Sequence, residues 1–368
     1  MKRKTIALVS QNKNPYSQTF VQAHKINFDA EVHYYYNGLP PTCLEGVGLL
    51  KPSLFILFKF FVLYHFFGKD TTVLQELILI DSFRKNKIEK VYAEFGPMGV
   101  SILKVCKKMG LPLIVNIHGY DVSRYEILEK YTERYRELFN YSDFVVVVSK
   151  KMKEMVAKLG ADTQKIIYTP CAPDDVFYNI TSNYEGNYFV SVGRFVDKKA
   201  PYYTILAFQR VIAKYPDVKL YIAGDGPLFN ACKNLIRYFK LEKNIILLGV
   251  IKQKELLELY KRAIGYVQHS ITADDGDMEG TPVSILEASA AGLPVISTKH
   301  AGITDVIIDG KTGLLVDEHD VDGMACNMIR ILSNNDFAVS LGKEGKENIQ
   351  NYFSMKNHIE KLNEIINN

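Results

Sequence analysis

Short runs of apolar and β-branched residues alternate with longer stretches of helical periodicity along the whole chain. Continuous apolar runs of this kind are typical of strands buried on both faces of a parallel sheet. The stretches between them predict helices, for example over 201–215, which opens with a proline, and over 253–263. The predicted strands are Thr5–Val9, Leu113–Ile117, Phe144–Val148 and Lys165–Tyr168 in the first half, and Tyr188–Val192, Lys219–Ala223, Asn244–Leu248, Gly265–Gln268 and Pro294–Ser297 in the second.

The segment 171–186 separates the two sets of strands and concentrates Pro, Asp, Asn, Ser and Gly, as a linker does. A chain of 368 residues is also too long for one ordinary core. We therefore predict an α/β protein with two doubly wound, Rossmann-like domains, over 1–175 and 176–350. Two such domains face a cleft at the carboxyl ends of their sheets, where ligands of open α/β sheets bind.

The most apolar stretch covers residues 49–67, and it approaches the length of a membrane span. Lys51, Pro52, Lys59 and His65 interrupt it, which disfavours a spanning helix. Two alternatives remain open: one or two partly buried helices of the first domain, or an exposed aromatic face that lies with its lysines on an anionic bilayer.

Composition and charge exclude several classes of function. The formal net charge of +4 is too weak to indicate a nucleic-acid partner, so any basic site is expected to be local. The five cysteines are scattered and never spaced as CxxC, which argues against a disulfide framework and a structural zinc site. The N-terminal residues include no apolar core of a signal peptide, so we expect a cytoplasmic protein.

The stretch 277–294 offers the most specific chemistry. Thr281 followed by Pro282 predicts a helix start with a hydroxyl N-cap, and the free N–H groups there, with Gly280 beside them, make an anion site. Glu287 follows about 9 Å along the helix axis, where it meets the ribose of a nucleoside diphosphate bound at the helix end. Glu279 then faces whatever the phosphate carries. The alternative is an amphipathic helix with two incidental glutamates.

Two further loops follow predicted strands. Gly193 ends a strand and precedes Arg194 and Lys199, a pair of cations suited to a pyrophosphate leaving group, although a solvated basic loop has the same composition. Gly224 also follows a strand and either approaches a ligand or serves only its turn. His118, at the carboxyl end of a first-half strand, is expected to project into the cleft.

The acidic run 274–277 contains a possible metal-binding pair, Asp275 and Asp277. Mg²⁺ sites use such carboxylates together with substrate phosphates. Because the neighbouring helix start and Arg194 and Lys199 already supply positive charge, we expect no metal here and assign the loop to the acceptor side.

Together these residues make the sequence resemble the retaining glycosyltransferases of family 4, which have the GT-B fold. In the first half, Glu94-Phe-Gly96 and Val148-Ser149 resemble members that build bacterial exopolysaccharides, such as those of colanic acid biosynthesis. The motifs that carry the resemblance are Gly-Arg-Phe-Val-x-Lys-Lys at 193–199, Gly-Asp-Gly-Pro at 224–227, Glu-Gly-Thr-Pro-x4-Glu-Ala at 279–288, Gly-Leu-Pro at 292–294, His-Ala-Gly-Ile at 300–303, Gly-Lys-Thr-Gly at 310–313, Pro-x-Ser-x-Thr-Phe at 15–20 and His-Gly-x-Asp at 118–121.

The resemblance implies a role for each matching residue. Arg194 and Lys199 would hold the donor diphosphate, Glu287 the ribose and Glu279 the donor sugar hydroxyls, while His118 would contact the sugar near the reacting carbon. It also implies that the last segment, 351–368, forms a helix that packs back on the first domain. No cofactor or metal is implied, since the nucleotide sugar is a co-substrate.

The acceptor side is less well matched. Many relatives carry a Gly-Gly turn after the first strand, whereas this chain has Ser10-Gln-Asn-Lys-Asn-Pro15 there. Ser17 and Thr19 are the nearest substitutes, and Tyr120 and Asp121 follow His118. These four are the candidate residues of the acceptor side.

The resemblance therefore implies a retaining transferase that moves a hexose from a nucleotide sugar to a saccharide, carried on a membrane lipid, in bacterial surface or exopolysaccharide biosynthesis. The aromatic stretch 49–67 motivates the lipid, and contact with the inner face of the cell membrane would follow. The alternatives are a sugar phosphorylase or small-acceptor glycosyltransferase of the same fold, or a non-catalytic nucleotide-sugar-binding protein.

Overall fold

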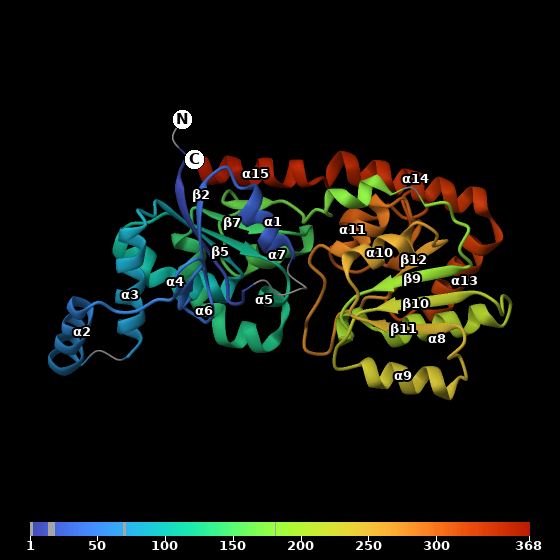
Figure 1. The fold of residues 1–368 in the computed structure, drawn as a ribbon, viewed down its shortest axis with the longest axis horizontal. Helices are drawn as coiled ribbons and strands as arrows, with labels where there is room; N and C mark the ends of the chain where they lie inside the picture. Colours follow the sequence, from blue (N-terminus) through green and yellow to red (C-terminus); the bar gives the residue numbers. More distant parts are fainter. Residues whose placement is uncertain (1–2, 14–18, 69–70, 181) are drawn as a thin grey trace.

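Two largely parallel β-sheets, each flanked by helices, lie side by side in the computed structural model, which describes residues 3–13, 19–68, 71–180 and 182–368 (Figure 1). The first sheet has the strand order β4-β3-β2-β1-β5-β6-β7-β8 and the second β11-β10-β9-β12-β13-β14, with only β2–β3 and β3–β4 antiparallel. The strands are β1 Thr5–Val9, β2 Glu31–Tyr36, β3 Cys43–Leu44, β4 Gly48–Leu49, β5 Lys90–Glu94, β6 Leu113–Ile117, β7 Phe144–Val147, β8 Ile166–Tyr168, β9 Tyr188–Val192, β10 Lys219–Ala223, β11 Ile245–Gly249, β12 Gly265–Val267, β13 Val295–Thr298 and β14 Leu314–Val316.

The helices connect these strands in two doubly wound sets. Those of the first set are α1 Thr19–Asn27, α2 Leu54–Phe67, α3 Thr72–Lys85, α4 Gly96–Met109, α5 Tyr120–Ser123, α6 Tyr125–Tyr141 and α7 Lys150–Lys158. Those that follow are α8 Pro201–Ile212, α9 Phe229–Tyr238, α10 Gln253–Tyr260, α11 Val283–Ala290, α12 Ile303–Val306, α13 Val321–Ser333, α14 Asn335–Tyr352 and α15 Met355–Asn367, with 3-10 turns η1 Asp175–Asn179 and η2 Asp197–Lys199.

The strands predicted from the apolar runs are confirmed in both sheets, but β2, β5 and β14 were missed together with the two-residue β3 and β4. β5 is buried along its whole length although it begins with Lys90 and ends with Glu94. The ammonium group of Lys90 donates a hydrogen bond to the carbonyl of Ile365 at 3.0 Å, so it has an acceptor inside the fold. The apolar pattern therefore missed this central strand because polar residues with buried partners stand at its two ends.

The linker segment 171–186 is anchored to both domains. Its side chains Phe177 and Ile180 are buried in one hydrophobic cluster that contains Val115 from the first sheet and Ile285 and Val295 from the second half. The two domains thus share part of a continuous core, which holds the cleft between them in shape.

The last helix, α15, lies against the first sheet after α14 has passed over the second (Figure 1). Ile359, Leu362 and Ile366 on α15 share a buried cluster with Ile6 and Leu8 of β1. Burial of this apolar face joins the end of the chain to its beginning.

Helix α2 projects away from the rest of the molecule at the end opposite the second domain (Figure 1). Only Ile56 is buried in it, while Phe55, Phe58 and Phe66 are 74%, 67% and 75% exposed. A helix was predicted here correctly, and it is only partly buried, through Ile56 and the half-buried Phe60, Val62 and Leu63. No helix in the described part of the chain combines the length and the apolar character that crossing a bilayer requires.

Candidate functional site

A cavity of about 360 Å³ opens where loops after strands of both sheets meet. His118 follows β6, Gly193 follows β9 and Gly224 follows β10, so the carboxyl ends of the strands point at one space, as the doubly wound topology predicts. The predicted site residues that line this cavity are Thr19, His118, Gly193, Arg194, Lys199, Gly224, Glu279, Gly280, Thr281 and Glu287.

Two glycines in the wall allow backbones to approach closely. A Cβ atom on Gly224, whose φ is +136°, would lie 1.9 Å from the carbonyl oxygen of Gly193. A Cβ atom on Gly280 would lie 2.2 Å from the carbonyl oxygen of His118. The first glycine therefore brings two loops of the second sheet together, and the second lets the two domains touch beside the cavity.

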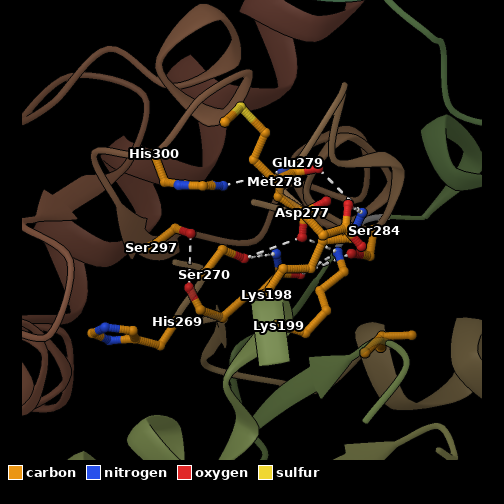
Figure 2. A network of polar contacts seen from close by, with 12 residues as sticks. Lys198, Lys199, His269, Ser270, Asp277, Met278, Glu279, Ser284, Ser297 and His300 are labelled. Carbon is orange, nitrogen blue, oxygen red and sulfur yellow. Dashed lines mark hydrogen bonds and ion pairs between the residues drawn. The ribbon is translucent and has the colours of Figure 1, made fainter. Parts of the chain in front are cut away.

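Three cationic side chains, those of Arg194, Lys198 and Lys199, enter the site from the loop after β9, and Figure 2 shows the two lysines. The Lys199 Nζ lies 2.9 Å from Oε1 of Glu279, and the Lys198 Nζ lies 2.9 Å from Oδ1 of Asp277. The side chain of Arg194 is exposed and makes no hydrogen bond or ion pair with the described residues. Its guanidinium is therefore available to an anionic ligand, while the two lysines are held in place by carboxylates.

Glu279 is a fixed carboxylate in the wall, with only 5% of its surface exposed. Ser270 donates to its Oε1 at 3.3 Å, and its backbone N–H donates to Nε2 of His300 at 3.1 Å (Figure 2). Burial alone would raise the pKa of Glu279, but the charges of Lys199 and Lys198 outweigh it and bring the pKa to about 2. The side chain is thus ionised at neutral pH and offers acceptors to hydroxyl groups.

The start of α11 differs in detail from the prediction. Pro282 is the N-cap, with ψ 88°, and it makes no side-chain cap. The predicted N-cap role of Thr281 is wrong, because its hydroxyl donates to the carbonyl of Val148 at 2.5 Å and accepts from the N–H of Cys171 at 3.1 Å. Thr281 therefore joins the two domains, and Pro282 lies outside the cavity lining.

The start of α11 still has backbone N–H groups that can bind an anion. The N–H groups of Val283 and Ser284 have no acceptor among the described residues, as expected for the first turn of a helix. Both residues line the cavity. The α11 tip therefore offers two backbone donors and the positive end of a helix dipole to a ligand.

The side chain of Glu287, one turn further along α11, is partly buried and makes no hydrogen bond or ion pair with the described residues. Burial, reinforced by the charge of Asp174 and opposed by Lys199, raises its pKa to about 8. A carboxyl group that lacks partners inside a cavity is suited to accept hydrogen bonds from a ligand.

His118 lines the cavity from the first domain, and its backbone carbonyl lies next to Gly280 of the second. Its Nε2 lies 2.7 Å from Oε2 of Glu94, and its ring stacks on Phe20 with centroids 4.1 Å apart. Burial disfavours the imidazolium, but bonds to Cys171 and Glu94 outweigh it and raise the pKa of His118. The ring is thus held on two sides.

The predicted acceptor-side residues do not all meet in the cavity. Thr19 lines it, and Ser17 lies outside the described residues. Asp121 is fully buried, and its carboxylate accepts the backbone N–H groups of Gly96, His118 and Gly119. Direct contact of Asp121 with an acceptor is therefore wrong, since it instead shapes the loop that carries His118. Tyr120 also lies outside the cavity lining and packs against Phe95.

Two carboxylates of the acidic loop after β12 form ion pairs with basic side chains. Asp275 pairs with Arg124 at 2.8 Å, and Asp277 pairs with Lys198. Within the described residues, no group of three His, Cys, Asp or Glu side chains could hold a metal ion. Through Arg124, this loop contacts the first domain.

The cavity also contains residues that the sequence reasoning did not assign. Lys198 and Phe20 stand inside the motifs quoted above, beside assigned residues, so their neighbours supplied a signal. Cys171 and Gln253, which come from the linker and from α10, carry no such signal. They reach the cavity only through the folded arrangement of the two domains.

Comparison with protein families divides the chain at the same linker. The family described as Glycosyltransferase Family 4 matches residues 30–175, and Glycosyl transferases group 1 matches residues 176–348. The chain is 31% identical over 242 residues to the putative colanic acid biosynthesis glycosyltransferase WcaL of Salmonella typhimurium, which covers 64% of this chain and 59% of that protein. It is 28% identical over 252 residues to the amylovoran biosynthesis glycosyltransferase AmsK of Erwinia amylovora, covering 68% and 62%. The chain therefore spans about six tenths of these relatives.

Solved structures share the fold over almost the whole chain. Anabaena Alr3699/HepE, crystallised with UDP and glucose, superposes with a TM-score of 0.76 at 16% identity, covering 99% of this chain and 100% of that one. Sucrose-phosphate synthase from Thermosynechococcus elongatus also gives a TM-score of 0.76, at 17% identity, covering 99% and 98%. The predicted GT-B arrangement of two facing Rossmann-like domains is confirmed.

Proposed function

We propose that this chain, which belongs to the glycosyltransferases of family 4, transfers a hexose from a nucleotide-sugar donor to a saccharide acceptor. The observation that carries the proposal is the cavity, where Arg194 and Glu287, whose side chains have no partner among the described residues, face one space together with the α11 tip. The names of the relatives, which refer to colanic acid and amylovoran biosynthesis, support a growing surface or extracellular polysaccharide as the acceptor.

The donor would lie along the second domain. Arg194, Lys199 and the N–H groups of Val283 and Ser284 would surround its diphosphate with donors. Glu287 would accept hydrogen bonds from the two ribose hydroxyls. Because these bonds favour the charged form, they would promote deprotonation of Glu287 when the donor binds. The sugar would then extend toward Glu279 and the first domain, where His118 lies.

The transfer itself needs an anionic leaving group more than a protein nucleophile. The acceptor oxygen forms a bond to the anomeric carbon, the bond from that carbon to the diphosphate oxygen breaks, and its electron pair leaves with the diphosphate. The acceptor proton passes to the departing diphosphate on the same face, which retains the anomeric configuration. Arg194, Lys199 and the helix tip would stabilise the negative charge that develops, so no metal is required in this scheme.

The donor assignment is tested with Lys199→Ala and the control Lys254→Ala, which removes an exposed lysine of α10 in the same domain. Thermal unfolding with a panel of nucleoside diphosphates and nucleotide sugars identifies the donor, because a ligand that binds only the folded state raises its stability. We expect the Lys199→Ala variant to lose both the thermal protection by the donor and the activity of sugar transfer to a polysaccharide precursor. The Lys254→Ala variant is expected to keep the protection and the activity. Unchanged turnover in Lys199→Ala would contradict the proposal.

The acceptor is proposed to be carried on a lipid at the inner face of the cell membrane, with α2 as the contact. Phe55, Phe58 and Phe66 expose their rings on this helix, and Lys51 and Lys59 are exposed beside them. Aromatic side chains insert at the headgroup level while lysines attract anionic lipids, so the composition of α2 suits an interfacial helix.

Flotation with vesicles containing anionic phospholipids tests the membrane contact. We expect the unmodified protein to float with such vesicles and the double variant Phe58→Glu, Phe66→Glu to remain in the dense fraction. Tyr238→Glu is the matched control, because Tyr238 is 79% exposed on α9 in the other domain. If the unmodified protein does not bind the vesicles, or if the α2 variant binds them equally well, the helix does not contact the membrane.

A further inference from the structure

A buried chain of polar side chains leads from the cavity into the first domain. It begins at His118, whose Nε2 lies 2.7 Å from Oε2 of Glu94. Asn116 donates to the same oxygen from Nδ2 at 3.1 Å, and Nδ1 of His24 lies 2.6 Å from the other oxygen, Oε1. Glu94, His24 and Asn116 are each completely buried. A single carboxylate thus collects three N–H donors from three different elements, β6, α1 and the loop after β6.

The chain continues to the C-terminal helix. Nε2 of His24 lies 2.8 Å from Nε2 of His358 on α15, and Nδ1 of His358 lies 3.0 Å from the hydroxyl of Thr169. His24 and His358 are separated by 334 residues, and their rings stack at 5.1 Å. The polar chain therefore ties α15 to the cavity residue His118 through two intermediate side chains.

The charges in this chain fix the direction of its hydrogen bonds. Burial alone would raise the pKa of Glu94, but His24 and His118 outweigh it and bring the pKa to about 2, so the carboxylate accepts from all three partners. Burial and the neighbouring His24 lower the pKa of His358 to about 3, so this ring is neutral. In every proton arrangement that satisfies these contacts, Nε2 of His118 carries a proton and donates it to Glu94.

A buried carboxylate of this kind is unfavourable unless its partners are kept in place. Here both histidine partners are held by a second contact: His118 by the Phe20 ring at 4.1 Å, and His24 by His358. Rotation of the His118 ring would break the bond to Glu94 and leave its charge with one fewer donor. The ring therefore has one favourable orientation toward the cavity.

We propose that Glu94 is the positioning residue of the transfer reaction, and that His24 and His358 hold it so that the C-terminal helix fixes the orientation of His118 in the cavity. This rests on the proposed function, in which His118 contacts the donor sugar. The role is positioning, since neither Glu94 nor the two buried histidines line the cavity.

The variant Glu94→Gln tests the proposal, because glutamine keeps the shape but its NH₂ group cannot accept a hydrogen bond. Misplacement of a reacting group by a remote change lowers turnover by about 100-fold, and we expect a fall of this size in kcat. The Kd of the nucleoside diphosphate is expected to stay unchanged, because Arg194, Lys199 and Glu287 lie in the other domain.

The matched control is Glu76→Gln, which alters another buried glutamate of the first domain that pairs with Lys104 and Lys108 away from the cavity. We expect it to change stability but not kcat. A fall in kcat for both variants would show that any lost buried carboxylate has this effect and would overturn the positioning role. A folded Glu94→Gln protein with unchanged kcat would also overturn it.

Nitrogen NMR of the histidine rings in the unmodified protein provides a test that does not need an active enzyme. We expect His118 to carry a proton on Nε2 that exchanges slowly with solvent, with the signal assigned by its loss in His118→Phe. An unprotonated Nε2 overturns the inference even if transfer is observed. Conversely, a protonated Nε2 in a protein that transfers no sugar would leave the hydrogen-bond chain intact and refute the proposed function alone.

Discussion

Replacing Glu287 by glutamine is expected to stabilise the protein at alkaline pH while it weakens donor binding. The folded protein raises the pKa of this group from 4.5 to about 8, so between these values it binds a proton that the unfolded chain releases. Stability contributed by that proton is fully present below pH 4.5 and is lost as the pH rises through 8. Glutamine does not titrate, so the variant avoids this loss.

The magnitude follows from the same values. At 1.36 kcal/mol per pKa unit, the whole difference corresponds to about 5 kcal/mol. Because the side chain is partly exposed in the cavity, solvent screening reduces the expected gain to about 1–2 kcal/mol at pH 8.5. Binding changes in the opposite direction, since the loss of charge-assisted hydrogen bonds to a ribose corresponds to an affinity about 30-fold lower.

Urea unfolding at pH 5 and pH 8.5 measures the first effect, and calorimetric titration with the nucleoside diphosphate that protects best measures the second. Glu242→Gln is the control, because Glu242 is exposed in the same domain and has no hydrogen bond or ion pair with the described residues. We expect Glu287→Gln to exceed the unmodified protein in stability at pH 8.5 only. If Glu287→Gln is no more stable than the unmodified protein at pH 8.5, or if its affinity for the nucleoside diphosphate is unchanged, Glu287 is not a ribose-binding carboxyl group.

Three further changes test other contacts of the site. Arg194→Gln should weaken nucleoside diphosphate binding at low salt, and the difference should shrink as salt is added, with no change in the unfolding midpoint, because the guanidinium has no partner in the described residues. Gly224→Ala should destabilise the fold by about 3 kcal/mol or more in denaturant titrations, since its Cβ would lie 1.9 Å from a carbonyl oxygen at φ +136°, whereas Gly249→Ala meets no atom within 4 Å and should lose only about 1 kcal/mol. Thr281→Val should lower the free energy of unfolding by about 2 kcal/mol, because it leaves two polar backbone groups of the first domain without their partner.

The second domain was largely accessible from sequence because its signals are local. Its strands are apolar runs, and Gly193, Arg194, Lys199 and Gly224 follow those strands within a few residues. Parallel strands place such loops at one edge of the sheet by topology alone, so their meeting in a cavity could be predicted. The hydroxyl of Thr281 could not, because its partners belong to the other domain.

The first domain was less accessible because its organising contacts are distant in sequence. The strand β5 ends in Glu94, whose partners His24 and His118 lie 70 and 24 residues away. A polar residue at a strand end looks like a loop residue until those partners are known. The structural role of Asp121 could not be predicted for the same reason, because its three backbone N–H donors come together only when the loop has folded.

The position of α15 sets the order in which the chain can finish folding. Ile6 and Leu8 are synthesised before Ile359 and Leu362, which cover them. Until α15 has been synthesised, the part of this face that it covers stays open to solvent and to other nascent chains, so a surface made early is completed late.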